Sequence, residues 1–478
     1  MRIVSKLARA MERVGFDQEK MIARQGWKVL RFVPVLCVGL LLLKTFRLYK
    51  GGAYFWLDDF NNLYWAQRAT FAQMVGHVVN PLSDYFRPAG MICYWILLRI
   101  FDLDPAPYHW LAWSLHVANT ALVYFILKQL TRARSGAAVG AMLFASQAVF
   151  ADIYWDFGTI FELMAAFFSF AGILVWISER RSWLHVLLAS LFLFLAMKSK
   201  EMAVVMPLVW IGYDLLVRKN VGRREVAQWI LPGALAFLYG LVKASEMRGV
   251  VHTHPYYMGI NGSTLASGYG IYFNMLFKAN LPWQIWGIGL VIFLLLSILL
   301  RSRLALFFQL YVLITFLPVI FLVNHRYAFF WYLPFLGVCG IAAILATGVA
   351  AGITARNPQW VAEASAYSVF ALLCCGTFFL HKEANRSQRS WIRDRANEYR
   401  SFVTGLKALP PPPYGETIYF ASEPSRFDQT SLLSATEVAL HRTDIGARLV
   451  SEFPFGARYR LQFNESRLTQ VHSRSDEK

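Results

Sequence analysis

Long apolar runs recur along most of this chain of 478 residues, and they limit its fold more than any other feature. The runs are roughly 16 to 22 residues long, and a helix needs about 20 to cross the hydrocarbon core of a bilayer. Only helices and closed barrels satisfy every backbone amide inside lipid, and unbroken Leu, Phe, Ala and Val suit helices. Because 57% of the residues are hydrophobic and only 16% are charged, the composition agrees. The sequence predicts an all-α polytopic membrane protein.

The basic residues indicate how the chain crosses the membrane. Although the net charge is +18, they form short clusters between apolar runs, so they predict topology and no nucleic-acid partner. With these clusters on the cytoplasmic side, we expect about 11 spans (range 10–13), a cytoplasmic N-terminus and an outer C-terminal segment. The run 91–101 is too short to span, and we assign it to the outer interface or a re-entrant element. The predicted spans are 33–46, 109–130, 135–152, 158–178, 183–197, 202–217, 228–246, 284–300, 304–323, 327–350 and 363–381.

The predicted topology divides the chain into three parts. Residues 1–32 are expected to form a basic amphipathic segment on the inner leaflet of the bilayer. Residues 33–381 form the transmembrane domain, with an outer loop over 49–107 and a longer outer loop that carries His252 and His254. Residues 382–478 turn polar, and "ETIYFA", "RYRLQF" and "SLLSATEVALH" predict two strands and a helix of a small extracytoplasmic α/β domain.

The stretch "AYFWLDDFNNLYW" places Asp58 and Asp59 among aromatic rings beside the membrane. Partial desolvation and a second carboxylate should raise the proton affinity of either group, which suits a general base near neutral pH. The alternative is an outer interface in which the rings form an aromatic belt and the aspartates face water.

Basic residues on the same predicted side could bind an anion. Arg87 in "DYFRPAG" could pair with a phosphate through two hydrogen bonds, or it could snorkel at a helix start. Lys200, beside Glu201 in "KSKE", breaks the positive-inside pattern, which favours a specific anion unless the helical hairpin is shifted in register. Arg326 in "NHRY" is a third candidate.

Further acids and histidines lie on that side. Asp156 and Glu162 belong to "ADIYWDFGTIFEL", and an acid inside a span usually pairs with a cation or lines a wet cavity. The H-x-H spacing of His252 and His254 lacks a third metal ligand, so we interpret it as part of a solvated loop. The sequence therefore predicts no metal site, although a divalent cation stays open as a cofactor.

The order of these motifs resembles that of the GT-C class of polytopic glycosyltransferases. The resemblance rests on the acidic pair, "FRP", "PAPYHWLAWSLHVANTALVYFIL", "ADIYWDFGTIFELMAAFFSF", "LAMKSKEMAVVMPLVWIGYDLL" and "HRYAFFWYLPFLGVC". It covers 54–216 and 324–339, and within the class it is similar to the protein O-mannosyltransferase-like branch, including the tetratricopeptide-bearing transmembrane mannosyltransferases. The repeats of those relatives are absent, which makes a protein acceptor less secure than sugar transfer itself.

The resemblance implies a membrane enzyme that uses a polyprenyl-phosphate-linked sugar at the periplasmic or lumenal face. It assigns the catalytic carboxylate to Asp58 or Asp59 and the donor phosphate to Arg87, Lys200 and Arg326. The acceptor would be a glycan, a lipid or a protein. Supporting roles fall to three acids, Asp156, Glu162 and Glu201.

The mechanism that fits these residues is a single displacement that inverts the anomeric centre. Asp58 would take the proton of the acceptor hydroxyl, and Asp59 would orient it or replace it as base. Two other functions stay open: a transporter or flippase of a lipid-linked saccharide, and a non-catalytic scaffold in envelope assembly. A transporter should need charges along its whole pore, whereas this chain concentrates them at one predicted face.

Overall fold

The structure is a computed structural model that describes eight continuous stretches of the chain. These are residues 54–83, 86–147, 149–219, 221–247, 249–354, 393–424, 427–464 and 467–470, together with a few isolated positions. The basic N-terminal segment 1–32, the first predicted span and the last predicted span lie outside these stretches.

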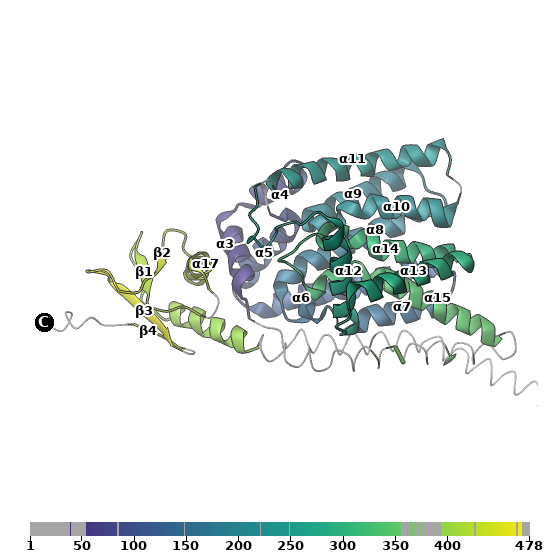
Figure 1. The fold of residues 1–478 in the computed structure, drawn as a ribbon. Helices are drawn as coiled ribbons and strands as arrows, with labels where there is room; N and C mark the ends of the chain where they lie inside the picture. The colour runs from purple at the N-terminus through teal and green to yellow at the C-terminus, as the bar shows by residue number, and fades with distance from the viewer. Residues whose placement is uncertain are drawn as a thin grey trace, which may run out of the picture.

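A bundle of apolar helices makes up most of the described chain, and Figure 1 shows many of them side by side with roughly parallel axes. Four helical stretches are long and apolar enough to cross a membrane: α6 (Pro105–Thr131), Phe157–Trp176, α11 (Arg223–Glu246) and α14 (Arg303–Ile320). Shorter apolar helices accompany them: α5 (Pro88–Phe101), α9 (Trp183–Ser199), α13 (Trp283–Leu299) and α15 (Phe335–Thr354). With the C-terminal sheet, this confirms the predicted class, a polytopic helical membrane protein with a small α/β unit.

Local sequence explains where these helices begin and how closely they pack. The side chain of Asp104 accepts the backbone N–H of Ala106 at 3.0 Å and caps α6, and Pro105 occupies its first position. In α7 (Arg134–Ser146), a Cβ on Gly136 or Gly140 would lie 2.5 or 2.8 Å from a backbone carbonyl of α15. Small residues therefore let these two helices approach each other as membrane helices commonly do.

Shorter elements connect the bundle. They are α3 (Leu57–Arg68), α4 (Phe71–Val79), η1 (Ala151–Tyr154), η2 (Phe157–Thr159), α8 (Ile160–Trp176), η3 (Glu201–Val205), α10 (Met206–Tyr213), the π-helix η4 (Asp214–Arg218), α12 (Gly262–Phe277) and η5 (Ala328–Trp331). Helix α12 corrects the sequence analysis, which placed residues 262–277 in a long loop. Its glycines and hydroxyl residues lower the apolar signal, but the side chain of Asn261 caps it by accepting the N–H of Thr264 at 2.8 Å.

The C-terminal unit is a small four-stranded sheet with two helices, a helical stretch over 393–407 and α17 (Gln429–Leu440). Its strands are β1 (Thr417–Phe420), β2 (Gly446–Leu449), β3 (Tyr459–Asn464) and β4 (Arg467–Gln470), in the order β2-β1-β3-β4. Strand β1 is parallel to β2 and β3, and β4 is antiparallel to β3. The predicted strands and helix α17 (Gln429–Leu440) are present, whereas β2 and β4 were not predicted.

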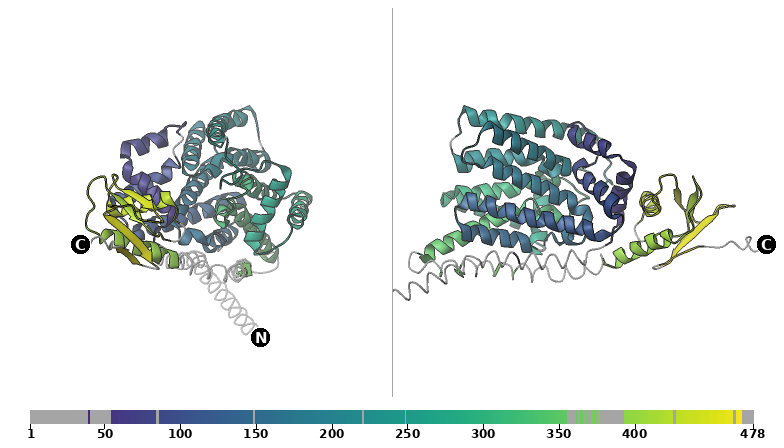
Figure 2. Two further views of the ribbon diagram at one scale, coloured as in Figure 1. Left: turned by 60° about the vertical axis from the view of Figure 1, so that its left-hand side comes forward. Right: turned by 180° about the vertical axis from the view of Figure 1, so that it is seen from behind.

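The C-terminal unit docks on the helix that carries the aspartate pair. Helices α3, α4 and α5 gather at one end of the bundle, beside this unit, in both Figure 1 and Figure 2. Arg68 at the end of α3 forms an ion pair with Glu437 of α17 at 2.6 Å. The buried ring of Phe60 packs against Tyr399 and Phe427, with centroid distances of 6.4 and 5.9 Å. Helix α3 therefore connects the bundle with the C-terminal unit.

Candidate functional site

Arg87 reaches the interior of this end of the bundle from an unusual backbone position. It precedes Pro88 at the start of α5 and has a left-handed conformation, with φ of 44°, that few residues other than glycine adopt. Its guanidinium stacks against the rings of Phe86 and Phe161, with its central carbon 4.2 and 5.4 Å from their centroids. Arg87 is buried, so its charge needs partners inside the protein.

Glu201 supplies one partner for Arg87. The Nε and Nη2 groups of Arg87 donate to the two carboxylate oxygens of Glu201 at 3.2 and 3.1 Å, across 114 positions of sequence. Burial raises the pKa of Glu201, but the charges of Arg87 and Lys200 outweigh it and lower the pKa to about 2. About a third of the Glu201 side chain, 34%, remains exposed. This ion pair is therefore open on one side.

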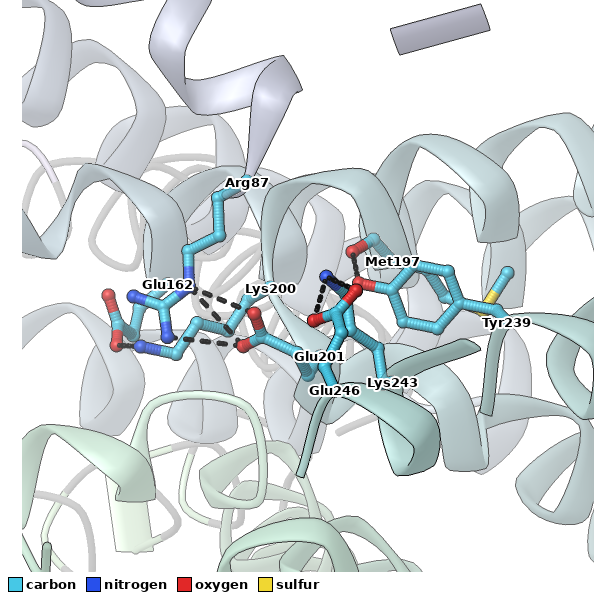
Figure 3. Close-up of polar contacts among 8 residues, drawn as sticks. All are labelled: Arg87, Glu162, Met197, Lys200, Glu201, Tyr239, Lys243 and Glu246. Atoms are coloured by element: carbon cyan, nitrogen blue, oxygen red, sulfur yellow. Dashed lines mark hydrogen bonds and ion pairs between the residues drawn. The ribbon is translucent and has the colours of Figure 1, made fainter. Parts of the chain in front are cut away.

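Lys200 and Glu162 form a second ion pair beside the first. The Lys200 ammonium donates to the Glu162 carboxylate, and both side chains are buried. Burial and the neighbouring charge of Arg87 lower the pKa of Lys200, while Glu162 and Glu201 oppose the shift. Figure 3 shows Arg87, Glu162, Lys200 and Glu201 converging on one point; we call these four residues the charged cluster.

A cavity of about 610 Å³ opens beside the charged cluster. A third ion pair, in the wall of the cavity, joins Lys243 and Glu246 at 2.8 Å (Figure 3). This volume is in the usual range for small-molecule sites. Apolar side chains dominate the rest of the lining, among them Met202, Val204, Met247, Val250, Ile260, Val319 and Leu322. The cavity therefore suits an amphiphilic ligand with an anionic head.

The two aspartates of α3 point to different surroundings, because adjacent residues of a helix are separated by about 100° around its axis. Asp58 is exposed. The protein around it raises the pKa of Asp58, and the charges of Arg87 and Lys200 partly offset that shift, which places the carboxylate within electrostatic reach of the charged cluster.

Asp59 is buried and faces the bundle. It accepts the hydroxyl hydrogen of Tyr94 at 2.6 Å and the backbone N–H of Trp56 at 3.3 Å. Burial raises the pKa of Asp59, and the hydrogen bonds from Tyr94 and Trp56 counteract it. Because Tyr94 belongs to α5, Asp59 ties the acidic helix to the helix that begins at Arg87. Of the pair, only Asp58 is both exposed and within electrostatic reach of the charged cluster.

Asp156 is within electrostatic reach of both aspartates and does not line the cavity. Its carboxylate caps η2 by accepting the N–H of Gly158 at 2.8 Å. Burial, followed by the charge of Asp59, raises the pKa of Asp156 well above its usual range. Within the described stretches, no group of three or more His, Cys, Asp or Glu side chains is arranged to hold a metal ion.

In the "NHRY" motif, His325 contacts residues of the cavity wall, whereas we expected Arg326 to do so. Arg326 donates its Nε–H to the carbonyl of Leu322 at 2.8 Å, and the cavity lining does not include it. The ring of His325 instead packs against Tyr256 at 4.8 Å and Phe330 at 5.8 Å, two residues that line the cavity. Burial and the charges of Lys200 and Arg87 lower the pKa of His325 to about 4.

The sequence analysis missed Tyr256 as well as His325. Tyr256 follows the H-x-H motif, and the only signal in the sequence was the density of aromatic residues in "HTHPYYMG". Among the described residues, His252 and His254 do not belong to a group that could hold a metal ion. The side chain of Asn324 donates to their backbone carbonyls at 2.7 and 3.1 Å.

Comparison with solved structures identifies the fold. The apo oligosaccharyltransferase of Archaeoglobus fulgidus matches with a TM-score of 0.53 and 12% identity, over 89% of this chain and 65% of that chain. Apo ArnT from Cupriavidus metallidurans matches with a TM-score of 0.52 and 13% identity, over 90% of this chain and 86% of that chain. The archaeal oligosaccharyltransferase AglB from Archaeoglobus fulgidus, in complex with an inhibitory peptide and a dolichol-phosphate, matches with a TM-score of 0.50 and 12% identity. This match covers 89% of this chain and 65% of that chain.

These similarities show a fold and not a close relative. No family model and no curated protein matches the sequence. The chain spans slightly less than two thirds, 65%, of the length of the oligosaccharyltransferases. The chain has the GT-C fold of polytopic membrane glycosyltransferases, and it is a multi-pass membrane protein.

Proposed function

We propose that this protein is a membrane glycosyltransferase that moves a sugar from a polyprenyl-phosphate-linked donor to an acceptor hydroxyl. The observation that carries the proposal is the position of Asp58, an exposed carboxylate within electrostatic reach of Arg87 and Lys200, which border an otherwise largely apolar cavity. The same fold holds a dolichol-phosphate in the archaeal oligosaccharyltransferase complex, which supports a lipid-linked donor.

The donor would enter with its phosphate at the charged cluster and its first isoprene units along the apolar wall. Guanidinium and ammonium groups stabilise a phosphate by charge-assisted hydrogen bonds. Arg87 and Lys200 are already paired with Glu201 and Glu162, so the phosphate must share these cations with the carboxylates or displace them.

The reaction needs a base on one side of the sugar and cations on the other. The acceptor oxygen forms a bond to the anomeric carbon while the bond from that carbon to the phosphate oxygen breaks. The electron pair of the broken bond stays on the phosphate, which Arg87 and Lys200 stabilise. The proton of the acceptor hydroxyl goes to Asp58, whose raised pKa makes it a stronger base than an ordinary carboxylate. The products are an inverted glycoside and a polyprenyl phosphate.

Several finer features belong to the same proposal. The sugar would be a hexose such as mannose, as in the protein O-mannosyltransferase-like branch, and the acceptor a glycan, a lipid or a protein. The site would face the periplasm or lumen, with the N-terminus in the cytoplasm and the C-terminal unit outside. Asp59 and Asp156 would hold the acidic end of the site in shape, and Arg326 remains a candidate for contact with the donor.

The replacement Asp58→Asn tests the base. We expect transfer to fall at least about 100-fold, the usual contribution of a general base, while the donor still binds. The assay uses purified protein and a labelled polyprenyl-phosphate sugar, and it measures transferred label and bound donor separately. The control is Asp104→Asn, because Asp104 caps α6 and Asn caps helices equally well.

Two results would contradict the proposal at different points. Full transfer by the Asp58→Asn variant would reject Asp58 as the base. Donor binding without any turnover by the unchanged protein would reject the enzyme and favour the transporter or the scaffold.

A further inference from the structure

A segment that connects α11 to α12 lies beside the charged cluster. Residues 249–261, which we call the strap, are fixed to the chain just after α14 by backbone contacts. The N–H of Gly259 donates to the carbonyl of Phe321 at 2.9 Å, and the N–H of Val323 donates to the carbonyl of Tyr257 at 3.2 Å. These two backbone hydrogen bonds fix the strap against the end of α14 and so hold the neighbouring side chains of the strap in place.

Tyr256 is the strap residue that meets Arg87. Its phenol is within electrostatic reach of Arg87, and its ring packs against His325 at an interplanar angle of 35° with a centroid distance of 4.8 Å. Tyr256 lines the same cavity as Arg87, Lys200 and Glu201. The phenol of the strap and the ion pair of Arg87 with Glu201 therefore border one cavity.

The Tyr256 hydroxyl can donate a hydrogen bond to a ligand in the cavity. A guanidinium has no acceptor, so Arg87 cannot take the phenol hydrogen, and among the residues that the structure describes no acceptor for it is recorded. Burial raises the pKa of Tyr256, and Arg87 opposes this shift. A phenol with a raised pKa keeps its proton at neutral pH and remains a hydrogen-bond donor.

We infer that Tyr256 is a phosphate-binding residue of the donor site, whose hydroxyl donates to a phosphate oxygen that Arg87 also contacts. The inference rests on the proposed function, because it takes the ligand at the charged cluster to be a lipid phosphate. The strap would thereby contribute a neutral donor to a site whose other donors are paired cations.

The chain offers a matched control in the next residue. Tyr257 is also on the strap and also lines the cavity, but its ring packs against His252, with a centroid distance of 4.1 Å. Replacing either tyrosine with phenylalanine removes one oxygen and leaves the ring. The pair of variants therefore separates loss of the Tyr256 hydroxyl from disturbance of the strap.

The experiment measures binding of farnesyl phosphate and of farnesol to the purified full-length chain. We expect Tyr256→Phe to weaken farnesyl phosphate about tenfold, as expected for loss of a hydrogen bond to a charged group, and to leave farnesol unchanged. Tyr257→Phe should change neither affinity by more than about twofold. A double-mutant cycle with Arg87→Lys should show coupling between the two residues, which a purely structural role of the phenol would not produce.

The outcomes separate this inference from the proposed function. If Arg87→Gln weakens farnesyl phosphate and Tyr256→Phe does not, the role of Tyr256 is wrong and the lipid-phosphate site stands. If Tyr256→Phe weakens farnesol equally, the hydroxyl acts on the strap and not on phosphate, and the inference is again wrong. If the unchanged protein binds farnesyl phosphate no better than farnesol, the inference and the proposed donor both fall.

Discussion

Two arginine–carboxylate pairs lie at opposite ends of α9, because Arg181 comes just before its first residue and Glu201 just after its last. In the first pair, both oxygens of Asp214 accept from Arg181 at 2.9 Å, and both side chains are completely buried. Gln228 accepts from Arg181 at 2.7 Å, and the indole of Trp229 donates to Asp214 at 2.8 Å. The arginine also stacks on Trp176 at 4.0 Å. Every side of this pair is closed.

The pair of Arg87 with Glu201 also uses two nitrogens of the guanidinium, but it has an open side. Arg87 is buried like Arg181, whereas 34% of the Glu201 side chain is exposed and the pair borders the cavity. A closed buried pair can only stabilise or specify a fold, whereas an open pair can exchange its carboxylate for another anion. Exposure of the carboxylate, and not the type of residue, would therefore separate a structural arginine from one that can bind an anion.

The largest expected effect comes from removing each arginine in turn. Arg181→Gln leaves Asp214 buried without its cation, which should cost about 3–5 kcal/mol of stability. Arg87→Gln leaves a partly exposed Glu201, so it should destabilise the fold much less, yet it should lower transfer at least about 100-fold by removing phosphate stabilisation. Thermal unfolding in detergent and the transfer assay measure the two effects.

The comparison fails if the two variants behave alike. Equal loss of stability would mean that Arg87 is also structural. Undiminished transfer by a stable Arg87→Gln variant would show that the open pair does not bind the donor.

A smaller effect is expected from the carboxylate of the open pair. If Glu201 competes with the donor phosphate for Arg87, as proposed, Glu201→Gln should strengthen farnesyl phosphate binding by roughly twofold to fivefold, the equivalent of a partly exposed ion pair. The control is Glu246→Gln, because Glu246 lines the same cavity, pairs with Lys243 and has the same exposed fraction, 34%. Binding titrations of both variants provide the measurement.

Weaker binding by the Glu201→Gln variant would show that Glu201 orients Arg87 for the phosphate and does not compete with it. An equal gain from Glu246→Gln would assign the effect to the overall charge of the cavity.

The smallest effect concerns the pH dependence of transfer. A base must be deprotonated, so activity should be lost as the pH falls through the raised pKa of Asp58, and this loss should begin at a higher pH than for an ordinary carboxylate. Asp428 of the C-terminal unit contributes to that raised pKa. Asp428→Asn should therefore move the acid limb of the pH–rate profile down by about a few tenths of a unit.

The control for this shift is Glu452→Gln, an exposed acid of the same unit. An unchanged acid limb in the Asp428→Asn variant would remove the C-terminal unit from the electrostatics of the site. Asn at position 428 keeps the cap of α17, so folding should not confuse the result.

Sequence patterns predicted the helical bundle and the convergence of distant motifs, because apolar runs and basic clusters are set by the bilayer itself. Arg87 and Glu201 are 114 positions apart, and the predicted topology correctly placed them at one end. Side-chain direction was not predictable. Asp58 and Asp59 have the same chemistry and differ only in which face of α3 they occupy, and Arg326 turns back to a carbonyl of its own loop. Tyr256 depends on long-range backbone pairing, which leaves no local pattern.

The size of the cavity bears on chain-length selectivity. A space of about 610 Å³ encloses a ligand the size of a drug molecule, which is far less than a complete long-chain polyprenol. Most of the tail of the proposed donor would therefore stay among the acyl chains of the membrane, where it would contact lipid and not protein. An enzyme built in this way would recognise the head and the nearest isoprenes, and carriers of different total length should compete for it on nearly equal terms.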